Sequence, residues 1–596
     1  MSASGTRSLL FCKALRESLR EHGLASLLRT DLLSGAVVGI IALPLSMALA
    51  IATGMPPQAG IFTAIAAGFV IALAGGSRVQ VSGPTAAFVV ILAPVVGHHG
   101  PAGLLMATLG AGIILLLAGF LRLGRLVEFI PNPVTAGFTA GIATVIALIQ
   151  VKDFLGLQFS VAPDGEMPAW RESNVALIQE TLRTLGGLKP GDAAIGVATL
   201  LMLLLWPKAW RRVPSALVVL PLAAVGAALL AAWRPDLAPA TIDSRFGTVV
   251  DGVARGGIPR GLPSFMLPWQ AAGAHGQPFT LDWEAVRTLV KYSFAIAMLG
   301  AIESLLSAVV ADAITGRRHD PDAELVGQGL GNLVAPFVGG FAATGALART
   351  AANVRAGARS PLSAMVHSVF LVVAVVAMAP WLGYLPMASL AGLLLIVARN
   401  MSDLKHCIFV VRRGPRGDAA VLILCFGLTV AFDMVIAVAV GVVAASLLFM
   451  RRMADLSAVD LGEGGAERAV SAERGILYYR VKGPLFFGAA QRAMNEVQVT
   501  QGGRVAVLDM EAVPMMDATG LINLESAVER LHMAGIAVIL CGVGPRPMEV
   551  LRRAGFEAGR WRVTFAPDRR RAMEVAQDLV TALAAPGGPQ AHTSGH

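Results

Sequence analysis

The chain has 596 residues, of which 55% are hydrophobic and 15% are charged, and its mean hydropathy is +0.67. Soluble domains carry about 25% charged residues, so the composition excludes a soluble enzyme or a nucleic-acid-binding protein for the chain as a whole. The net charge of +9 has another role in a membrane protein, where Lys and Arg orient the spans. The sequence predicts a polytopic α-helical membrane protein.

Residues 1–30 hold several charged side chains and lack the apolar run of a signal peptide. We expect a basic amphipathic cytosolic segment there, followed by a transmembrane transport domain over 31–453. About fourteen apolar windows in this region suit spans of a bilayer whose hydrocarbon is about 30 Å thick. The expected spans cover 33–53, 57–75, 83–97, 102–121, 134–151, 193–206, 215–233, 288–312, 323–339, 344–357, 362–380, 383–398, 419–432 and 434–450.

Basic residues gather in alternate connections between these spans, for example Arg122 with Arg125 and Arg317 with Arg318. The short connections on the opposite side hold no Lys or Arg. Because short cytosolic loops carry an excess of Lys and Arg, this alternation predicts that both termini face the cytosol.

The composition changes after the last span. Strand-like runs at 476–481, 504–510 and 536–541 alternate with helical stretches at 520–533, 547–554 and 569–583. This alternation predicts a cytosolic α/β domain within 454–585. The tail 586–596 is rich in Pro, Gly and His, and we expect it to be disordered.

Two short spans, the third and the tenth, share an unusual start. One begins with Ser82-Gly83-Pro84-Thr85 and the other with Thr344-Gly345, and small residues follow in both. They are seven spans apart, so two seven-helix halves would have opposite orientations, as in transporters with inverted repeats and broken helices. Opposed helix N-termini would form an anion site. The alternative is two ordinary helix starts whose small residues serve packing.

Ionisable residues are scarce within the spans. Glu303 lies near the middle of the eighth and Arg349 in the tenth. A charge at the bilayer centre costs at least about 2.5–3.5 kcal/mol and usually marks a substrate or proton path. We expect Glu303 to carry a proton; the alternative is a structural ion pair with Arg349. Ser304 and Ser307 follow on the same helix, and their hydroxyls are expected to bond carbonyls of that helix.

The chain shows no nucleophile–base pair, phosphate-binding loop or metal-ligand spacing, and its four cysteines are far apart. The isolated histidines, His98, His99 and His367, have no second ligand at a suitable spacing. We therefore predict neither an enzyme nor a metal site, and no cofactor beyond a coupling ion.

The run Pro44–Ala50, with Gly54, Pro56–Gly60 and Ser82-Gly83-Pro84, resembles the sulfate permease (SulP) family of anion transporters. Within that family, the runs Gly76–Ile91 and Glu324–Asn332 are most similar to bacterial C4-dicarboxylic acid transporters. The resemblance implies a seven-plus-seven inverted repeat, with a core of spans 1–4 and 8–11 and a gate of spans 5–7 and 12–14. It also implies elevator-like movement of the core and a homodimer in the bilayer.

The resemblance places a small anionic substrate between the third and tenth spans, near the first. The implied substrate-binding residues are Ser82, Gly83, Thr85, Ala348, Arg349, Thr350, Leu45 and Leu49. Ala348 stands where animal relatives commonly have serine, so contact there would come from its backbone N–H. Sodium-coupled bicarbonate relatives have aspartate at the Glu303 position and threonine at the Ser307 position, so the resemblance implies that Glu303 and Ser307 are the ion-coupling residues. The glutamate favours a proton over sodium as the coupling ion.

The stretch Met516-Asp517-Ala518-Thr519-Gly520 resembles the regulatory loop of a STAS domain. Thr519 occupies the position that is phosphorylated in soluble relatives, and a cytosolic partner protein would dock near Asp517. The alternative is that Thr519 only caps the following helix.

Together these features predict proton-coupled uptake of C4-dicarboxylates across a bacterial inner membrane. The alternatives are transport of sulfate, sodium-coupled transport of bicarbonate, and an anion channel or voltage-driven motor on the same scaffold. A further alternative is a signalling protein in which the STAS domain antagonises a partner.

Overall fold

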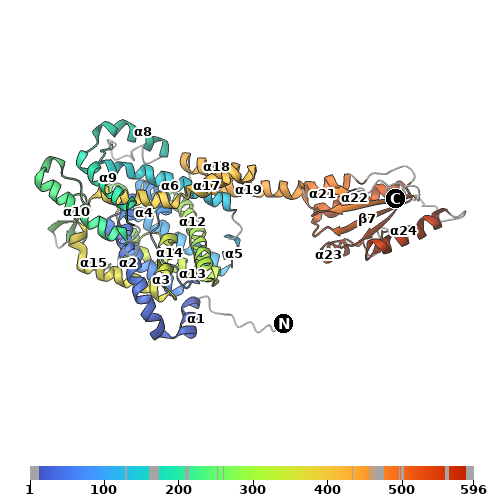
Figure 1. Ribbon diagram of the computed structural model, residues 1–596, viewed down its shortest axis with the longest axis horizontal. Helices are drawn as coiled ribbons and strands as arrows, with labels where there is room; N and C mark the ends of the chain where they lie inside the picture. Colours follow the sequence, from blue (N-terminus) through green and yellow to red (C-terminus); the bar gives the residue numbers. More distant parts are fainter. Residues whose placement is uncertain are drawn as a thin grey trace. The chain divides into compact units, whose positions relative to one another are not determined.

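The computed structural model describes residues 12–127, 131–159, 173–207, 214–250, 253–259, 261–432, 434–455, 458–460, 475–495, 497, 503–556 and 563–584. The predicted tail 586–596 lies outside this part of the chain. Two compact units divide the protein, Met1–Val442 and Val443–His596. We call them the membrane unit and the C-terminal unit and describe each by itself (Figure 1).

The membrane unit is helical, and each expected span coincides with a helix. Within the described residues, eight helices are long and apolar enough to cross a membrane, or nine if one pair bent by 113° is a single span. Its principal helices are α1 (Lys13–His22), α2 (Leu24–Thr53), α3 (Pro57–Ala74), α4 (Ala86–Phe120), α5 (Gly124–Val127), α6 (Asn132–Leu155), α8 (Asn174–Thr184), α9 (Pro190–Leu204), α10 (Ser215–Trp233), α11 (Ile242–Arg245), α12 (Trp283–Thr315), α13 (Pro321–Val334), α14 (Leu347–Arg355), α15 (Leu362–Leu382), α16 (Met387–Met401), α17 (Leu404–Arg413), α18 (Arg416–Ala431) and α19 (Met434–Asp455), the last of which continues past Val442.

Glycines at positive φ set two boundaries that differ from expectation. Gly23 (φ 71°) separates α1 from α2, so α2 begins at Leu24, within the segment expected to precede the first span. Gly100 (φ 68°) breaks α4 into two helical parts, which are the expected third and fourth spans. Side-chain-bearing residues rarely adopt this conformation, so glycine permits both breaks.

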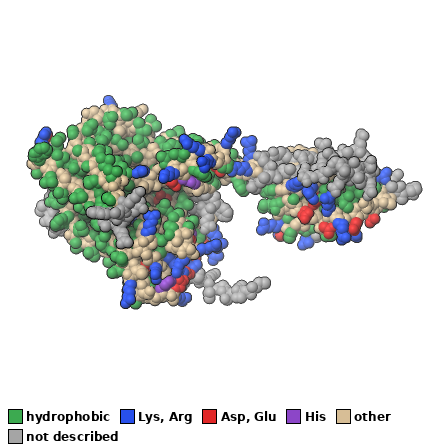
Figure 2. All heavy atoms as spheres, viewed as in Figure 1, with side chains coloured by type: hydrophobic (Ala, Val, Ile, Leu, Met, Phe, Trp, Pro, Cys, Tyr) green, Lys and Arg blue, Asp and Glu red, His purple; other side chains and the backbone are tan. Residues whose placement is uncertain are grey.

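The helix α1 is tied to the loops beside it by ion pairs. Lys13 Nζ lies 2.5 Å from Asp320 Oδ2, and Glu21 accepts from Arg78 at 2.6 Å and from Arg317 at 2.9 Å. The hydrogen bond from Arg78 is the main cause that lowers the pKa of Glu21 to about 2. Figure 2 shows basic and acidic side chains gathered near α1, whereas hydrophobic side chains cover much of the visible face of the other helices.

Small strands complete the membrane unit. β1 (Ser82–Gly83) pairs with β4 (Thr344–Gly345), and β2 (Gly247–Val250) pairs with β3 (Val253–Gly256), each antiparallel. The first pair joins segments that are more than 250 residues apart in the chain. It positions the candidate site described below.

The C-terminal unit contains a five-stranded sheet in the order β5-β6-β7-β8-β9. β5 is antiparallel to β6, and the other neighbours are parallel. Its elements are β5 (Ala458–Asp460), β6 (Ile476–Lys482), α21 (Phe487–Asn495), β7 (Val505–Ala512), α22 (Ala518–Met533), β8 (Ala537–Cys541), α23 (Pro545–Arg553), β9 (Val563–Ala566) and α24 (Arg569–Ala584).

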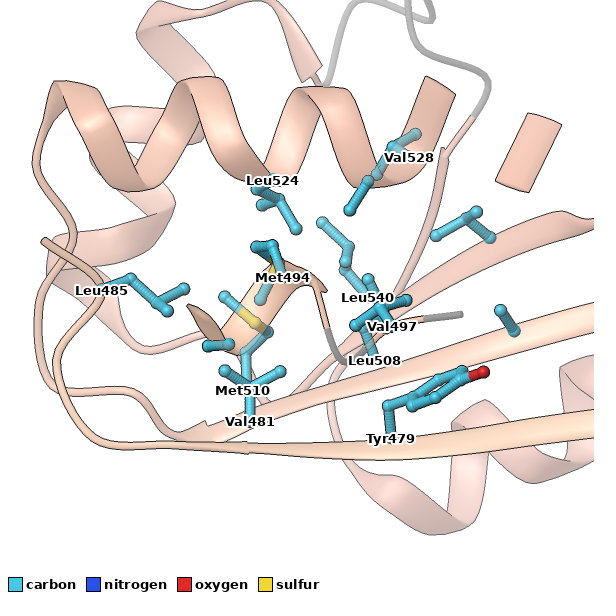
Figure 3. Close-up of a cluster of buried hydrophobic side chains, with 14 of the residues drawn as sticks. Tyr479, Val481, Leu485, Met494, Val497, Leu508, Met510, Leu524, Val528 and Leu540 are labelled. Carbon is cyan, nitrogen blue, oxygen red and sulfur yellow. The ribbon is translucent and has the colours of Figure 1, made fainter. Parts of the chain in front are cut away.

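Two apolar clusters flank this sheet. On one face, Leu508 and Leu540 pack with Leu524 and Val528 of α22 (Figure 3). On the other, Val507 and Ile539 pack with residues of α24. Alternate residues of β7 and β8 thus point to opposite faces, both of which helices cover, as parallel sheets require.

Candidate anion-binding site

The antiparallel pair β1–β4 brings the starts of two helices together. Ser82 is paired with Gly345, and Gly83 with Thr344. α4 begins three residues after Gly83, and α14 begins two residues after Gly345. The backbone N–H of Ala346 also donates to the carbonyl of Val81 at 2.9 Å. The third and tenth spans therefore meet at their broken starts, as the sequence predicts.

The first turns of α4 and α14 expose hydrogen-bond donors at this meeting point. In α14, Thr350 makes the first intrahelical bond, to Ala346. The N–H groups of Leu347, Ala348 and Arg349 precede it and have no partner within the helix. Each helix N-terminus also carries roughly half a positive charge. An anion is the ligand that such a pair of helix starts favours.

Arg349 adds a full positive charge to the same place. Its side chain is 2% exposed, and its Nη2 donates to the carbonyl of Pro84. A Cβ on Gly83 would lie 2.7 Å from Arg349 Nη1, so the guanidinium packs directly on the β1 backbone. Within the described chain, Arg349 Nε and Nη1 are buried and have no hydrogen-bond partner. Two donors of a buried guanidinium are thus left for a ligand.

Glu303 reaches the site through a threonine. Thr85, the residue that precedes α4, donates from Oγ1 to Glu303 Oε2 at 2.8 Å and makes no capping bond. The described residues form no ion pair between Glu303 and Arg349, although the charge of Arg349 acts on Glu303 through space. The contact from Thr85 links the carboxylate of α12 to the start of α4.

Ser307 and Thr350 form a second link between α12 and the site. Ser307 Oγ donates to Thr350 Oγ1 at 3.1 Å, and Thr350 Oγ1 also accepts from the N–H of Val81 at 3.1 Å. Contrary to expectation, Ser304 and Ser307 do not bond carbonyls of α12. Ser304 donates to Glu324 of α13 and Ser307 donates to Thr350 of α14, because both helices pack against α12.

Three implied residues take less central positions. Ala348 is exposed, next to the buried Arg349, as the second residue of α14. Leu45 and Leu49 lie just after Pro44 in α2, which packs against α14. Leu49 is 1% exposed and Leu45 is half-buried. These leucines offer apolar walls and no polar contact.

Glu324 was not among the predicted site residues, yet its hydrogen bonds hold the segment that leads into β1 against α12 and α13. Its carboxylate is 1% exposed and accepts five hydrogen bonds. Oε1 accepts from Gln80 Nε2 (3.0 Å), Ser304 Oγ (3.1 Å) and Gln328 Nε2 (2.9 Å), and Oε2 accepts from the N–H groups of Gly76 (3.1 Å) and Ser77 (3.0 Å). Gln328 also donates to Ser82 Oγ at 3.1 Å. The sequence signal was an acidic residue inside an expected span.

A cavity of about 750 Å³ lies along α12. Its wall includes Ile302, and it extends to Arg317 and His319 in the loop before α13, with Thr135 of α6 also lining it. None of the site residues named above is among the residues that line it. The described residues hold no group of three or more metal-ligating side chains.

In the C-terminal unit, the predicted loop caps a helix. Asp517 is the N-cap of α22, and its Oδ1 accepts from the N–H of Gly520 at 2.7 Å. Thr519 therefore does not cap the helix; it is exposed in the first turn. Nearby on the sheet, the buried Asp509 accepts from Tyr478 Oη at 2.5 Å. Burial, together with Asp509, raises the pKa of Tyr478.

The profile of the Sulfate permease family matches residues 28–425, and that of the STAS domain matches residues 468–566. A Bacillus subtilis protein named "Putative sulfate transporter YvdB" is 37% identical over 88% of this chain and 93% of its own length. The bicarbonate transporter BicA of Picosynechococcus sp. is 29% identical over 84% of this chain and 86% of its own.

Among solved structures, the murine anion transporter Solute Carrier 26 family member A9 superposes with a TM-score of 0.78, covering 97% of this chain and 96% of that one at 17% identity. This superposition confirms the expected fold class, and the matched families define a multi-pass membrane transport protein with a C-terminal STAS domain. The chain belongs to the sulfate permease family.

Proposed function

We propose that this protein is a secondary active transporter of a small inorganic anion, sulfate or bicarbonate. The observation that carries the proposal is the β1–β4 pair, which joins two helix N-termini beside the unpartnered donors of Arg349. Helix N-termini and a guanidinium both favour oxyanions. The names of YvdB and BicA point to the same two substrates.

The relatives named above do not support the expected preference for C4-dicarboxylates. We therefore replace it with the alternative of sulfate or bicarbonate transport. The charges at the site agree with this change. In the described chain, the positive groups at the strand pair are Arg349 and the two helix starts that the pair brings together. A compact oxyanion meets them together, whereas a dicarboxylate needs a second cationic group for its distant carboxylate.

We propose that Glu303 carries the coupling ion, which is a proton. Its carboxylate accepts a hydrogen bond from Thr85 at the start of α4, and the charge of Arg349 acts on it. The protonation of Glu303 is therefore coupled to the charge at the neighbouring helix starts. Sodium is the alternative ion, and Ser307 would then be one of its ligands. No prosthetic cofactor enters the mechanism.

The wider arrangement follows from the family and belongs to the same proposal. We place the protein in a bacterial inner membrane as a homodimer with both termini in the cytosol. The core moves against the gate like an elevator and carries the site across the bilayer. A cytosolic partner binds the STAS domain near Asp517, and phosphorylation of the exposed Thr519 adjusts the rate. A helix N-terminus favours such added negative charge.

Uptake into proteoliposomes tests the function. Purified protein is reconstituted, and uptake of radiolabelled sulfate, bicarbonate and succinate is followed under an imposed proton or sodium gradient. We expect sulfate or bicarbonate to accumulate above its external concentration with a proton gradient. Accumulation of succinate alone would restore the dicarboxylate hypothesis. Passive flux that no ion gradient drives would indicate a channel.

A further inference from the structure

His367 is a buried imidazole with no partner in the described chain. It lies in α15 and is 0% exposed, and both ring nitrogens are without a hydrogen bond. A neutral imidazole has one N–H donor and one acceptor nitrogen. Leaving both unpaired in the interior costs free energy. The position therefore calls for a polar partner that the described side chains do not supply.

One hydrogen bond between α14 and α15 lies a helical turn from both Arg349 and His367. Asn353 Nδ2 donates to Ser363 Oγ at 2.8 Å. Arg349 is four residues before Asn353, and His367 is four residues after Ser363, and residues four apart share a helix face. Each therefore lies one turn from the bonded pair, on the face that carries it. The charge of Arg349 also acts on the imidazole.

Residues close to His367 on α15 contact the segment that includes β1. Ala364 packs with Val81, the residue before β1. Ser368 Oγ and the carbonyl oxygen of Ser82 each lie 3.1 Å from the position that a Cβ would take on Gly68. α15 thus lies beside the segment that includes β1.

The orphan donors on this side belong to two residues. Arg349 offers Nε and Nη1, and His367 offers an N–H on one ring nitrogen. In the described chain, Arg349 is the charged group that acts on His367. The charge of Glu303 acts on Arg349, but the two side chains form no ion pair in the described chain, so the donors Nε and Nη1 stay without a partner. An oxyanion with several oxygens can accept from both residues.

We propose that His367 donates a hydrogen bond to the anion held by Arg349 and the two helix starts, and so determines which oxyanion is preferred. The assignment rests on the proposed function. Sulfate presents four oxygens in a tetrahedron and can meet donors from several sides at once. Bicarbonate is planar and singly charged, with one oxygen protonated. His367 therefore favours sulfate over bicarbonate.

Equilibrium binding to the purified full-length protein tests this assignment. Radiolabelled sulfate is titrated against wild type, His367→Ala and His367→Gln, and unlabelled bicarbonate is measured by competition. His98→Gln is the matched control, because His98 is an exposed histidine on α4. The melting temperature of each ligand-free variant reports on folding.

We expect His367→Ala to raise the dissociation constant for sulfate at least about tenfold, the usual effect of losing a hydrogen bond to a charged group. The loss for bicarbonate should be smaller. His367→Gln keeps an N–H donor and should recover part of the affinity, and His98→Gln should bind as wild type does.

Wild-type affinity in His367→Ala would overturn the assignment. The assignment would also be wrong if both variants bound sulfate equally weakly and both melted at a lower temperature. That result would mean that His367 serves only the packing of the interior. Binding of sulfate and bicarbonate by the wild-type protein tests the proposed function independently of the variants. If it binds neither sulfate nor bicarbonate, the proposed function falls and the assignment falls with it.

Discussion

Replacing Glu324 with glutamine tests whether this carboxylate holds the strand pair in place. The side chain is nearly isosteric, but an amide nitrogen donates and cannot accept. If the amide oxygen takes the place of Oε1, it keeps the bonds from Gln80, Ser304 and Gln328. The amide nitrogen then faces the N–H groups of Gly76 and Ser77. The opposite orientation leaves three donors unpaired and is worse.

The expected loss follows from the two backbone donors. An unsatisfied buried donor costs about 1–3 kcal/mol. With two such donors, the N–H groups of Gly76 and Ser77, Glu324→Gln should lower the free energy of unfolding by about 2–6 kcal/mol. The change also loosens the loop that leads into β1, and sulfate affinity should fall with stability.

Equilibrium unfolding in mixed detergent micelles, followed by tryptophan fluorescence, measures the effect. Glu284→Gln serves as the control, because Glu284 is exposed in the first turn of α12. That substitution should change stability by less than about 1 kcal/mol. If Glu324→Gln is as stable as Glu284→Gln and binds sulfate normally, the five hydrogen bonds do not organise the site.

Four further predictions concern the site and the C-terminal unit. Gly83→Ala should weaken anion binding at least about tenfold and lower the melting temperature, because its Cβ would lie 2.7 Å from Arg349 Nη1 and because Gly83 has a φ of 156°, which side-chain-bearing residues rarely adopt; normal binding would contradict that packing. Arg349→Lys should weaken sulfate more than a monoanion in competition binding, since lysine lacks the bidentate fork; equal losses would mean that Arg349 supplies only a general field. Glu303→Gln should abolish proton-driven accumulation but leave exchange partly intact, whereas normal accumulation would refute the proton assignment. Thr519→Glu and deletion after Met453 should change the uptake rate without changing which anion is chosen.

Much of the fold could be predicted from local patterns. Apolar windows indicate the spans because the bilayer imposes their length and composition. In the C-terminal unit, β6, β7 and β8 coincide with the expected strands. β7 and β8 are largely buried runs, and β6 is rich in the β-branched and aromatic residues that strands favour. β5 and β9 were not predicted. They are edge strands of three and four residues, and β9 is mostly partly exposed, so their sequences carry little strand signal.

The candidate site could be predicted in part. The paired starts at Ser82 and Thr344 indicated the meeting of two broken spans, and β1–β4 realises it. No local sequence pattern predicted the roles of Glu324 and His367. The partners of Glu324 at Gly76 and Gln80 are more than 240 residues away in the chain. Such contacts depend on tertiary packing, which no local pattern records.

The bond from Ser307 illustrates the same limit. Serine in a helix commonly bonds a carbonyl of the preceding turn, and that local rule predicted the wrong partner. The hydroxyl of Thr350 lies within 3.1 Å because α14 packs against α12, and it accepts the bond instead.

The central claim is that the transported anion binds where α4 and α14 begin. The most direct measurement is an experimental structure of the protein determined with sulfate at saturating concentration. The account predicts sulfate density against the first-turn N–H groups of both helices, within hydrogen-bond distance of Arg349 Nε or Nη1. Density confined to the loop arginines Arg317 and Arg318, with the helix starts unliganded, would contradict it.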